Sequence, residues 1–444
     1  MPKKIKSNFS QPKINFNLQR VKGTRDILPE EYIYWDFFTQ AVDKVARSYS
    51  FKPISTPIIE NTGLFSRSLG KETDIVDKQM FSFTDKGRDK ITLRPENTAG
   101  IARAYIETGM HNLPQPVKLF YQGPMFRYEQ PQTGRLRQFY QFGLEILGSA
   151  SSSLDAELIF VANLIFKALG LKDIVTQVNS IGCLECRLVY KNALVNFYRG
   201  QTAKLCPDCR RRLRLNPLRV LDCKNPKCQK LSSQAPQIVD FFCKDCHRDF
   251  KLILEHLDGL GINYELNPSL VRGLDYYSRT VFEFVPKDKK QLSQGSIGAG
   301  GRYDYLIEVL GGRSVPAVGL ALGIERVINL IKEQKVKLPS VKPPQVFLAQ
   351  LGNVAKIKSL KLFEEFRQNR LIMAESFGRD SIKSQLKQAN RLAVKFVLIL
   401  GQKEALDNTI LLRDMASGVQ EVVKLDKVIA EIKRRLRKIK KQAN

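Results

Sequence analysis

All eight cysteines of this 444-residue chain fall in one short stretch, and they come in four closely spaced pairs. Three pairs have the spacing C-x-x-C and one has C-x4-C. The pairs are Cys183/Cys186, Cys206/Cys209, Cys223/Cys228 and Cys243/Cys246. Clustered cysteine pairs of this kind are typical of thiolate ligands to a structural zinc ion. The stretch is therefore predicted to form a small module stapled by metal.

Other uses of these cysteines are less favoured. The basic N-terminus lacks the apolar stretch of a signal peptide, which argues against disulfides. Reduced thiols without a metal are one alternative; a redox dithiol is another, but nothing nearby resembles a thioredoxin-like unit. We predict at least one structural Zn²⁺, and the sequence leaves open which four sulfurs share an ion. The candidate ligands are Cys206, Cys209, Cys223, Cys228, Cys243 and Cys246.

The chain is long enough for two to four domains, and its segments differ in their patterns of apolar, polar, glycine and proline residues. Helices are predicted over 30–49 and 155–171. After the connector KVKLPSVKPP, strands and helices alternate as in a small α/β domain with a largely parallel sheet. The Cys-rich segment interrupts a domain whose pieces lie on both sides of it, so it is interpreted as an insertion. The predicted segments are a basic tail (1–20), a first core segment (21–182), the insertion (183–257), a second core segment (258–333), a linker (334–343), a C-terminal domain (344–436) and a basic tail (437–444).

The charge balance is strongly basic. Lys and Arg outnumber Asp and Glu by 72 to 44, which gives a formal net charge of +28. Such an excess attracts polyanions and makes their binding depend on salt, so nucleic acid is the favoured partner. No run approaches the 18 or more apolar residues of a membrane helix, and we expect no membrane partner.

The stretch KLFYQGPMFRYEQPQTGRLRQFYQFGLEILG (118–148) predicts two strands joined by a turn-rich loop. Alternation places apolar side chains on one face of the second strand. Its other face carries Arg137, Phe139, Gln141, Gly143 and Glu145. A face exposed to water would also alternate, but such faces favour Lys, Thr and Glu over a flat ring and a glycine. We therefore predict a pocket above this face, with the glycine leaving room for it.

Other motifs add polar residues near predicted strand ends. Arg127 and Glu129 share a face of the first strand, and TLRPENTAG places Glu96 and Thr98 after a proline. The glycines of SIGAGGRYDYL (296–306) fit no phosphate-binding spacing, so we interpret them as allowing close strand approach. The stretch AVGLALGIERV (317–327) predicts a strand that runs into a helix carrying Arg326.

The stretch LVRGLDYYSRTVFEF (270–284) places an arginine, a glycine, an aspartate and two tyrosines just before an alternating strand. Together the motifs predict a sheet platform whose arginines, carboxylates and tyrosines face an open space. Such a space suits an anionic substrate beside a cationic or hydrogen-bonding one. The chain has only three histidines, which argues against acid–base catalysis by histidine.

These motifs, in this order, resemble those of the histidyl-tRNA synthetase family, which belongs to the class II aminoacyl-tRNA synthetases. The resemblance covers Val21 to about Leu436. FRYEQPQTGRLRQF looks like motif 2 of the class, GLALGIERV like motif 3, and the stretch through PISTPIIE like motif 1. VRGLDYYSRTVFEF and GAGGRYDYL look like two histidine-specific signatures. The implied fold is α+β, with an antiparallel-sheet catalytic core, a Cys-rich insertion and a C-terminal α/β anticodon-binding domain.

The resemblance also implies a reaction: histidine, ATP and Mg²⁺ give histidyl-adenylate, and the histidyl group then passes to tRNA(His), in a cytoplasmic homodimer. By resemblance, Glu96, Thr98 and Gln141 hold the α-amino group. Glu145 and Tyr277, with Tyr276 beside them, recognise the imidazole. Arg127 and Arg272 are catalytic groups on the α-phosphate. The implied ATP-binding residues are Arg127, Glu129, Arg135, Phe139, Arg272 and Arg326.

Arg272 is interpreted as a fixed guanidinium that stabilises the charge building on the α-phosphate in the transition state. Gly273 is expected to let it approach closely by leaving no bulk behind it. Two residues depart from the family pattern: Asn97 replaces a usual Gly, and Gln130 replaces an Arg of many bacterial members. They put in doubt the contacts near the α-amino group and the recognition of the tRNA 5′ end. The insertion is expected to embrace the acceptor stem.

Two other classes of protein share some of these features. A paralogous regulatory subunit of ATP phosphoribosyltransferase binds histidine without activating it, but such chains typically lose the Arg272-type signature and the anticodon domain, which this chain keeps. A zinc-ribbon RNA-binding protein with an inactive synthetase core is the other alternative. Histidine-dependent ATP–pyrophosphate exchange separates all three.

Overall fold

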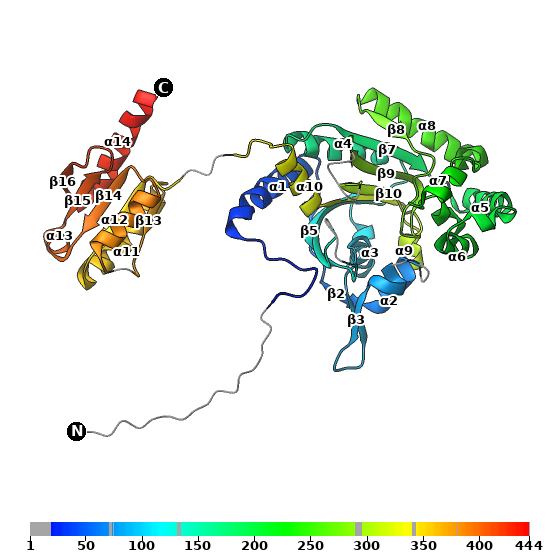
Figure 1. The fold of residues 1–444 in the computed structure, drawn as a ribbon, viewed down its shortest axis with the longest axis horizontal. Coiled ribbons are helices and arrows are strands. Elements are labelled where there is room, and N and C mark those ends of the chain that lie inside the picture. The colour runs from blue at the N-terminus through cyan, green and yellow to red at the C-terminus, as the bar shows by residue number, and fades with distance from the viewer. Residues whose placement is uncertain are drawn as a thin grey trace, which may run out of the picture. The chain divides into compact units, whose positions relative to one another are not determined.

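The computed structural model describes residues 19–70, 73, 75–130, 135–288, 295–339, 343–378 and 380–443. The chain forms two compact units, Met1–Leu338 and Pro339–Asn444 (Figure 1). Most of the predicted N-terminal tail, some of the linker, and residues 131–134 of the motif 2 loop lie outside the described residues. The predicted segment boundaries therefore stay predictions.

An eight-stranded sheet forms the centre of the first unit, and its six inner strands are antiparallel neighbours. The short edge strands β1 and β8 run parallel to the strands beside them. This arrangement confirms the antiparallel catalytic core. In sheet order the strands are β1 (Lys52–Pro53), β5 (Val117–Phe126), β6 (Gln138–Leu147), β11 (Ala317–Gly323), β10 (Gly298–Arg302), β9 (Ser278–Pro286), β7 (Ile174–Ser180) and β8 (Tyr264–Leu266).

One side of this sheet forms an apolar core with α1 (Pro29–Ser48), α4 (Ser153–Ala168) and α10 (Ile324–Glu333). α1 begins with a proline and two glutamates, which suit a helix N-terminus. Its Phe38 meets Phe142 of β6 edge to face, with ring centroids 6.2 Å apart. Leu144 and Ile146 follow on the same side and are buried, as the alternation predicts.

The other side of the sheet carries smaller elements. α2 (Thr62–Ser68), α3 (Thr98–Glu107) and α9 (Leu306–Val309) pack together there. A three-stranded sheet lies beside them, in the order β2 (Ile59–Asn61), β4 (Lys90–Leu93) and β3 (Phe81–Thr84). A π-helical turn (Ile75–Gln79) and a 3-10 turn (Met110–Asn112) complete this region.

Glycines in β10 and β6 have different neighbours. A Cβ atom on Gly300 would lie 2.3 Å from the carbonyl oxygen of Gly319 in β11, which confirms that these glycines let strands approach. The expectation for Gly143 was wrong in one respect. Gly143 pairs with Tyr121 of β5, and a Cβ on Gly143 would lie 2.3 Å from Cζ of that ring. The space above Gly143 is therefore occupied by Tyr121 and not by open pocket.

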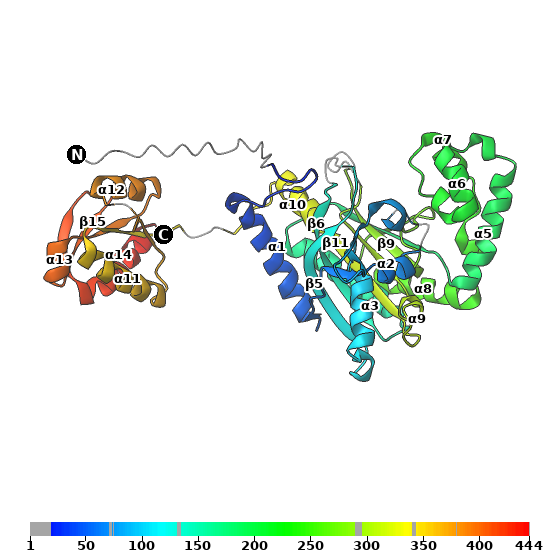
Figure 2. The ribbon, with the colours of Figure 1, turned by 90° about the horizontal axis from the view of Figure 1, so that it is seen from below.

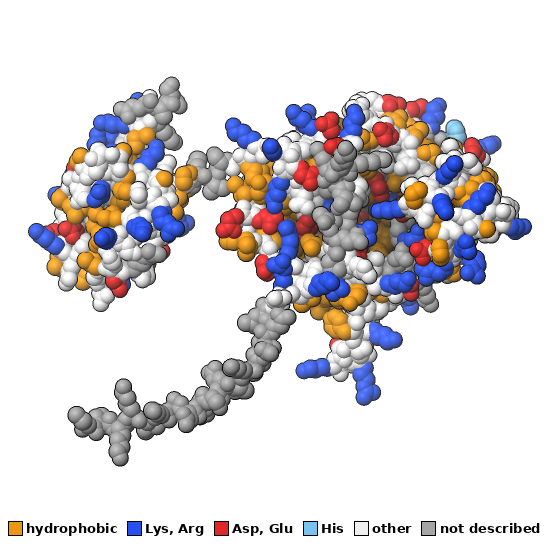
Figure 3. Space-filling model, viewed as in Figure 1, with side chains coloured by type: hydrophobic (Ala, Val, Ile, Leu, Met, Phe, Trp, Pro, Cys, Tyr) orange, Lys and Arg blue, Asp and Glu red, His pale blue; other side chains and the backbone are white. Residues whose placement is uncertain are grey.

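The Cys-rich segment is helical and leaves the sheet after β7, returning at β8 (Figures 1 and 2). Its α-helices are α5 (Leu184–Arg199), α6 (Pro207–Leu215), α7 (Pro226–Ser232) and α8 (Lys244–Gly259). Three 3-10 turns join them, Thr202–Lys204, Pro217–Val220 and Ile238–Phe241. Lys and Arg side chains are frequent on the region of the surface where these helices lie (Figure 3).

The second unit has a five-stranded sheet, and the expectation of a largely parallel sheet was only half right. β13, β12 and β14 are parallel, whereas β15 and β16 are antiparallel. The strands in order are β13 (Met373–Glu375), β12 (Val346–Gln350), β14 (Phe396–Leu400), β15 (Thr409–Asp414) and β16 (Gln420–Lys424). The helices are α11 (Asn353–Gln368), α12 (Ile382–Arg391), α13 (Gln402–Leu406) and α14 (Val428–Ala443), with a 3-10 turn at Leu425–Lys427.

Candidate active site

A cavity of about 720 Å³ lies in the first unit, on the side of the large sheet opposite its α1–α4–α10 core. It gathers residues from β5, β6, β9, β10 and β11 and from the starts of α3 and α10. With the exception of Glu145, every residue predicted to bind histidine or ATP lines it. These residues are Glu96, Thr98, Arg127, Glu129, Arg135, Phe139, Gln141, Arg272, Tyr276, Tyr277 and Arg326.

Glu96 holds the start of α3. Its two carboxylate oxygens accept hydrogen bonds from the backbone N–H groups of Thr98 (2.7 Å) and Ala99 (2.9 Å). These donors are among the unpaired amides of a helix N-terminus, where a carboxylate is stabilised. Burial nevertheless raises the pKa of Glu96 above its ordinary value. The Glu96 carboxylate therefore both accepts the first N–H groups of α3 and forms part of the cavity wall.

Glu145 lies just beneath the cavity wall and is 1% exposed. One of its oxygens accepts from the Thr98 hydroxyl at 2.8 Å and the other from the Tyr303 hydroxyl at 2.5 Å. Burial raises the pKa of Glu145 to about 8, although these two hydrogen bonds act in the opposite direction. Thr98 and Tyr303 both line the cavity, so they connect Glu145 to whatever binds there.

Space for Glu145 depends on a glycine of the neighbouring strand. Gly319 of β11 pairs with Glu145 in the sheet. A Cβ on Gly319 would lie 1.6 Å from Oε2 of Glu145, which is far closer than any contact between atoms that are not bonded. A larger residue at position 319 would therefore displace the carboxylate.

Two arginines of the cavity are held in place by backbone carbonyl groups. Arg127 donates from Nε to the Pro95 carbonyl at 2.9 Å, and its guanidinium lies 5.3 Å from the centre of the Phe139 ring. Arg326 donates to the Ser296 carbonyl at 2.7 Å. Burial lowers the pKa of both groups, and neighbouring arginines lower each further. Cations that converge in this way favour an anionic ligand.

Arg272 and Arg135 are paired with glutamates at the cavity. Arg272 donates to Glu283 of β9, and its guanidinium lies 5.5 Å from the centre of the Tyr277 ring. Arg135 lies 3.4 Å from a carboxylate oxygen of Glu129. A Cβ at Gly273 would meet no atom within 4 Å, so contacts within the chain do not account for this glycine, and its expected role stays a prediction. The placement of Arg272 depends on Glu283 and Tyr277.

Three tyrosine rings form one side of the cavity. The centroids of Tyr276 and Tyr277 are 4.6 Å apart, and those of Tyr276 and Tyr303 are 5.7 Å apart. Sequence reasoning singled out the first two but missed Tyr303, although its motif was noted. It also missed Glu283, whose position in an alternating strand suggested only a polar face. The signal that could have identified Glu283 is that it is an acidic residue in a strand next to the glycine-rich strand β10.

Residues outside the predicted set complete the surroundings. Glu325, on the first turn of α10, accepts the backbone N–H of Tyr140 at 3.0 Å, and burial raises its pKa to about 7. The Cys-rich segment supplies Asp222 and Lys224 to the cavity lining. Asn97 is buried, and its Oδ1 accepts from Thr56 and Arg94 rather than facing the cavity.

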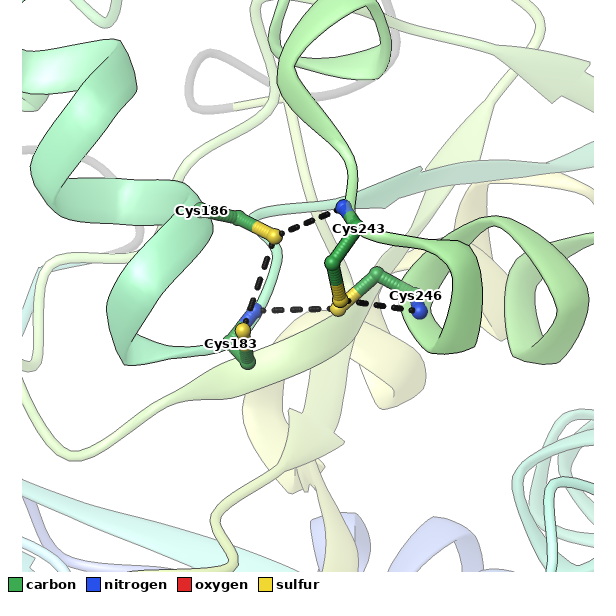
Figure 4. A group of neighbouring side chains, drawn as sticks. All are labelled: Cys183, Cys186, Cys243 and Cys246. Atoms are coloured by element: carbon green, nitrogen blue, oxygen red, sulfur yellow. Dashed lines mark hydrogen bonds between the residues drawn. The ribbon is translucent and has the colours of Figure 1, made fainter.

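The eight cysteines form two separate groups of four. In each group the sulfur atoms all lie within 4.8 Å of one another. The root cluster consists of Cys183, Cys186, Cys243 and Cys246 (Figure 4). The outer cluster consists of Cys206, Cys209, Cys223 and Cys228. Two of the six predicted ligands, Cys243 and Cys246, therefore belong with the Cys183/Cys186 pair, which the predicted ligand set left out.

Comparison with known proteins gives consistent matches. The family model for histidyl-tRNA synthetase matches residues 23–189 and 230–327, and that for an anticodon binding domain matches 345–435. The histidine--tRNA ligase of Dehalococcoides mccartyi is 46% identical over 418 residues, covering 94% of this chain and all of that one. That of Thermosipho melanesiensis is 45% identical over 411 residues, covering 93% and 97%. The crystal structure of apo S. aureus histidyl-tRNA synthetase has a TM-score of 0.76 at 35% identity, covering 93% of this chain and 99% of that one.

The antiparallel sheet, its arginine-lined cavity and the C-terminal anticodon-binding domain define a class II aminoacyl-tRNA synthetase. Within this class, the chain belongs to the histidyl-tRNA synthetase family. The family attaches histidine to tRNA(His) through an aminoacyl-adenylate. The match confirms the resemblance found in the motifs. No helix within the described residues is both long and apolar enough to cross a bilayer.

Proposed function

We propose that the cavity binds histidine and ATP side by side, forms histidyl-adenylate, and then transfers the histidyl group to tRNA(His). The observation that carries this proposal is the gathering of eleven predicted substrate residues around one cavity. Buried carboxylates and tyrosine hydroxyls occupy one region of it, where a cationic, hydrogen-bonding amino acid fits. Arginines occupy another region, where phosphates fit.

In the proposed histidine subsite, Glu96, Thr98 and Gln141 hold the α-amino group. Tyr277 and Tyr303 present hydroxyls to the imidazole. Glu145 acts from beneath, because its oxygens already accept hydrogen bonds from Thr98 and Tyr303. A side chain without two ring nitrogens leaves these buried groups unpaired, which disfavours competing amino acids by roughly 10⁴-fold or more.

In the proposed ATP subsite, Phe139 and Arg326 enclose the adenine, and Arg135 and Arg326 reach the outer phosphates. Glu129 and Glu283 offer the carboxylate oxygens that Mg²⁺ prefers, so the cavity suits ATP as its magnesium complex. The histidine carboxylate attacks the α-phosphate, and pyrophosphate leaves. Arg127 and Arg272 stabilise the negative charge that builds on the α-phosphate during this displacement.

The same proposal covers the bound metal, the contacts with tRNA and the pairing of two chains. The outer cluster binds a structural Zn²⁺ through four thiolates. The basic Cys-rich segment contacts the acceptor stem, and the C-terminal unit contacts the anticodon. Two copies of the chain pair through the motif 1 region, where Ile58 and Ile59 are 41% and 49% exposed. We also propose the segment boundaries given by the sequence and a cytoplasmic location.

The decisive experiment is ATP–pyrophosphate exchange with and without histidine, followed by charging of tRNA(His) transcripts. We expect exchange that requires histidine, and no measurable charging with glutamine or asparagine. Histidine binding without exchange would instead identify a regulatory paralogue. RNA binding with neither histidine binding nor exchange would identify an inactive synthetase core.

A further inference from the structure

We propose that the root cluster binds a second structural Zn²⁺, and that this ion sets the position of Tyr277 through Arg187. The metal site is independent of the reaction. The effect on histidine recognition rests on the function proposed above.

The geometry of the root cluster suits a tetrahedral ion. The four Sγ atoms lie within 4.8 Å of one another, and those of Cys183 and Cys186 are 3.5 Å apart. Zn–S bonds of about 2.3 Å in a tetrahedron require sulfur separations of about 3.8 Å. Both pairs have the C-x-x-C spacing of structural zinc sites. Figure 4 shows the sulfurs converging from the starts of two helices.

Backbone groups around the cluster favour thiolates, the form of cysteine that binds zinc. The N–H groups of Cys183 and Cys243 donate to the sulfurs of Cys246 (3.2 Å) and Cys186 (3.1 Å), and that of Cys246 points to Cys243 at 3.5 Å. Cys183 and Cys243 are the N-cap residues of α5 and α8, both 16 residues long, whose N-termini carry partial positive charge.

A half-buried cation completes the surroundings of the cluster. Nη1 of Arg279, the second residue of β9, lies 3.9 Å from Sγ of Cys246 and 2.5 Å from Asp249 of α8. A Zn²⁺ ion with four thiolates carries two net negative charges, which a neighbouring guanidinium offsets. Without the ion, four ionised sulfurs in so small a volume repel one another.

Arg187 connects this cluster to the cavity. It follows Cys186 directly on the first turn of α5, and its Nη1 donates to the Tyr277 carbonyl at 2.8 Å. The backbone of Arg279 also pairs with Ile181 and Gly182, just before the first ligand. The start of α5 is therefore fixed relative to the segment that carries Tyr277. An ion at the root cluster fixes it further by bonding α5 to α8.

Counting metal in the purified full-length protein tests the site. We expect two Zn²⁺ per chain. Cys246→Ser in the root cluster and Cys228→Ser in the outer cluster should each lower the count to one. A Zn²⁺ count that Cys246→Ser does not lower would overturn the proposed root-cluster site, whatever the outer cluster binds and whatever the activity is.

Histidine KM in the exchange reaction tests the positioning role. Arg187→Ala should keep both ions. It should raise the histidine KM about tenfold or more, because Tyr277 loses a hydrogen bond from a charged donor. The ATP KM should stay within twofold, because no ATP-binding residue loses a contact. Arg187→Lys should restore some of the affinity. Cys246→Ser should repeat the selective rise in the histidine KM, and Cys228→Ser should not.

Equal rises in both KM values, or none, would refute the link to Tyr277. If Cys246→Ser does not fold, the unaltered protein and the Arg187 variants still decide both the metal count and the link. If the unaltered protein shows no exchange, calorimetric histidine titration of the Arg187 variants separates failure of the link from failure of the proposed reaction.

Discussion

Arg272 and Glu283 form an ion pair at the cavity, with Nη1 of the arginine donating to Oε1 of the glutamate. The arginine precedes the strand that carries the glutamate, and both side chains are largely buried. A buried pair of this kind holds a guanidinium in a defined orientation before the substrate arrives. Electrostatic stabilisation of a transition state requires such preorganisation.

Arg272→Lys should retain ATP and histidine binding but lose most histidine-dependent ATP–pyrophosphate exchange, because lysine lacks the planar fork. A charge pair about 4 Å apart is worth about 4 kcal/mol at an effective dielectric near 20, which corresponds to about a thousandfold in rate. Arg248→Lys, an exposed arginine of α8, is the matched control. Near-normal exchange by Arg272→Lys would remove Arg272 from the proposed role.

Glu145 should make stability depend on pH. Its pKa of about 8 in the folded state exceeds the ordinary value of 4.5, so the folded state binds more protons. Its contribution to the free energy of unfolding is therefore complete below pH 4.5 and is lost as the pH rises to about 8. Denaturant titrations of the Glu145→Gln variant should lack this component of the decline. Glu325→Gln, with a pKa of about 7, should remove only a decline that ends near pH 7. Identical pH profiles for Glu145→Gln and the unaltered protein would contradict the shifted pKa.

Gly319→Ala should damage the histidine subsite, because the added Cβ overlaps Oε2 of Glu145. Such overpacking typically costs about 1–3 kcal/mol, and we expect a lower melting temperature together with a higher histidine KM. Gly259→Ala at the end of α8 is the control, since its Cβ meets nothing within 4 Å. A Gly319→Ala enzyme with unaltered histidine KM would show that Glu145 does not influence recognition.

Asp155→Asn should destabilise the first unit by about 1–3 kcal/mol, because buried Arg302 loses its charged hydrogen bonds to Asp155 and keeps only Asp304 as an ionic partner. The two side chains are 0% and 3% exposed, and Arg302 Nε lies 3.1 Å from Oδ2 of Asp155. Asp43→Asn breaks an exposed pair with Arg47 and should cost less than about 1 kcal/mol. Denaturant unfolding of both variants measures the contrast, and similar losses would argue against it.

Arg211→Glu and Arg214→Glu on α6 should weaken tRNA(His) binding and reduce its dependence on salt. Both side chains are exposed in the basic Cys-rich segment. Each lost phosphate contact should lower the slope of log K against log salt by about one. ATP–pyrophosphate exchange should not change. Unaltered tRNA affinity at low salt would show that this face does not contact the nucleic acid.

Local patterns in the sequence predicted much of the fold. The helix predicted over 30–49 is α1, and the alternation of β6 placed Phe142 and Leu144 in the core, because strand period two is a local property. β16 was not predicted, since its edge position leaves it mostly exposed and without an apolar face. The direction of β15 depends on chain path rather than on composition, which explains the error over the parallel sheet.

The candidate site was predicted less completely. Motif resemblance identified most of the cavity residues, but which residues touch was not accessible from one chain. Glu283 contacts Arg272 because the path of the chain from Arg272 into β9 brings the two side chains together. This path is not visible in the sequence. The grouping of Cys183 with Cys246 could not be predicted either, because they lie 63 positions apart and their proximity depends on how the intervening helices fold.

The same proximity has a consequence for how this protein tolerates change. The backbone N–H of Cys183 donates to Sγ of Cys246. The chain therefore enters the Cys-rich segment at Cys183 and comes back beside the same place at Cys246. The strand pairing of the eight-stranded sheet therefore does not depend on the length of the chain between these positions, although Arg187 contacts the Tyr277 carbonyl and Asp222 and Lys224 line the cavity. Changes in length are therefore tolerated best in the part of this segment that lies away from both the root cluster and the cavity.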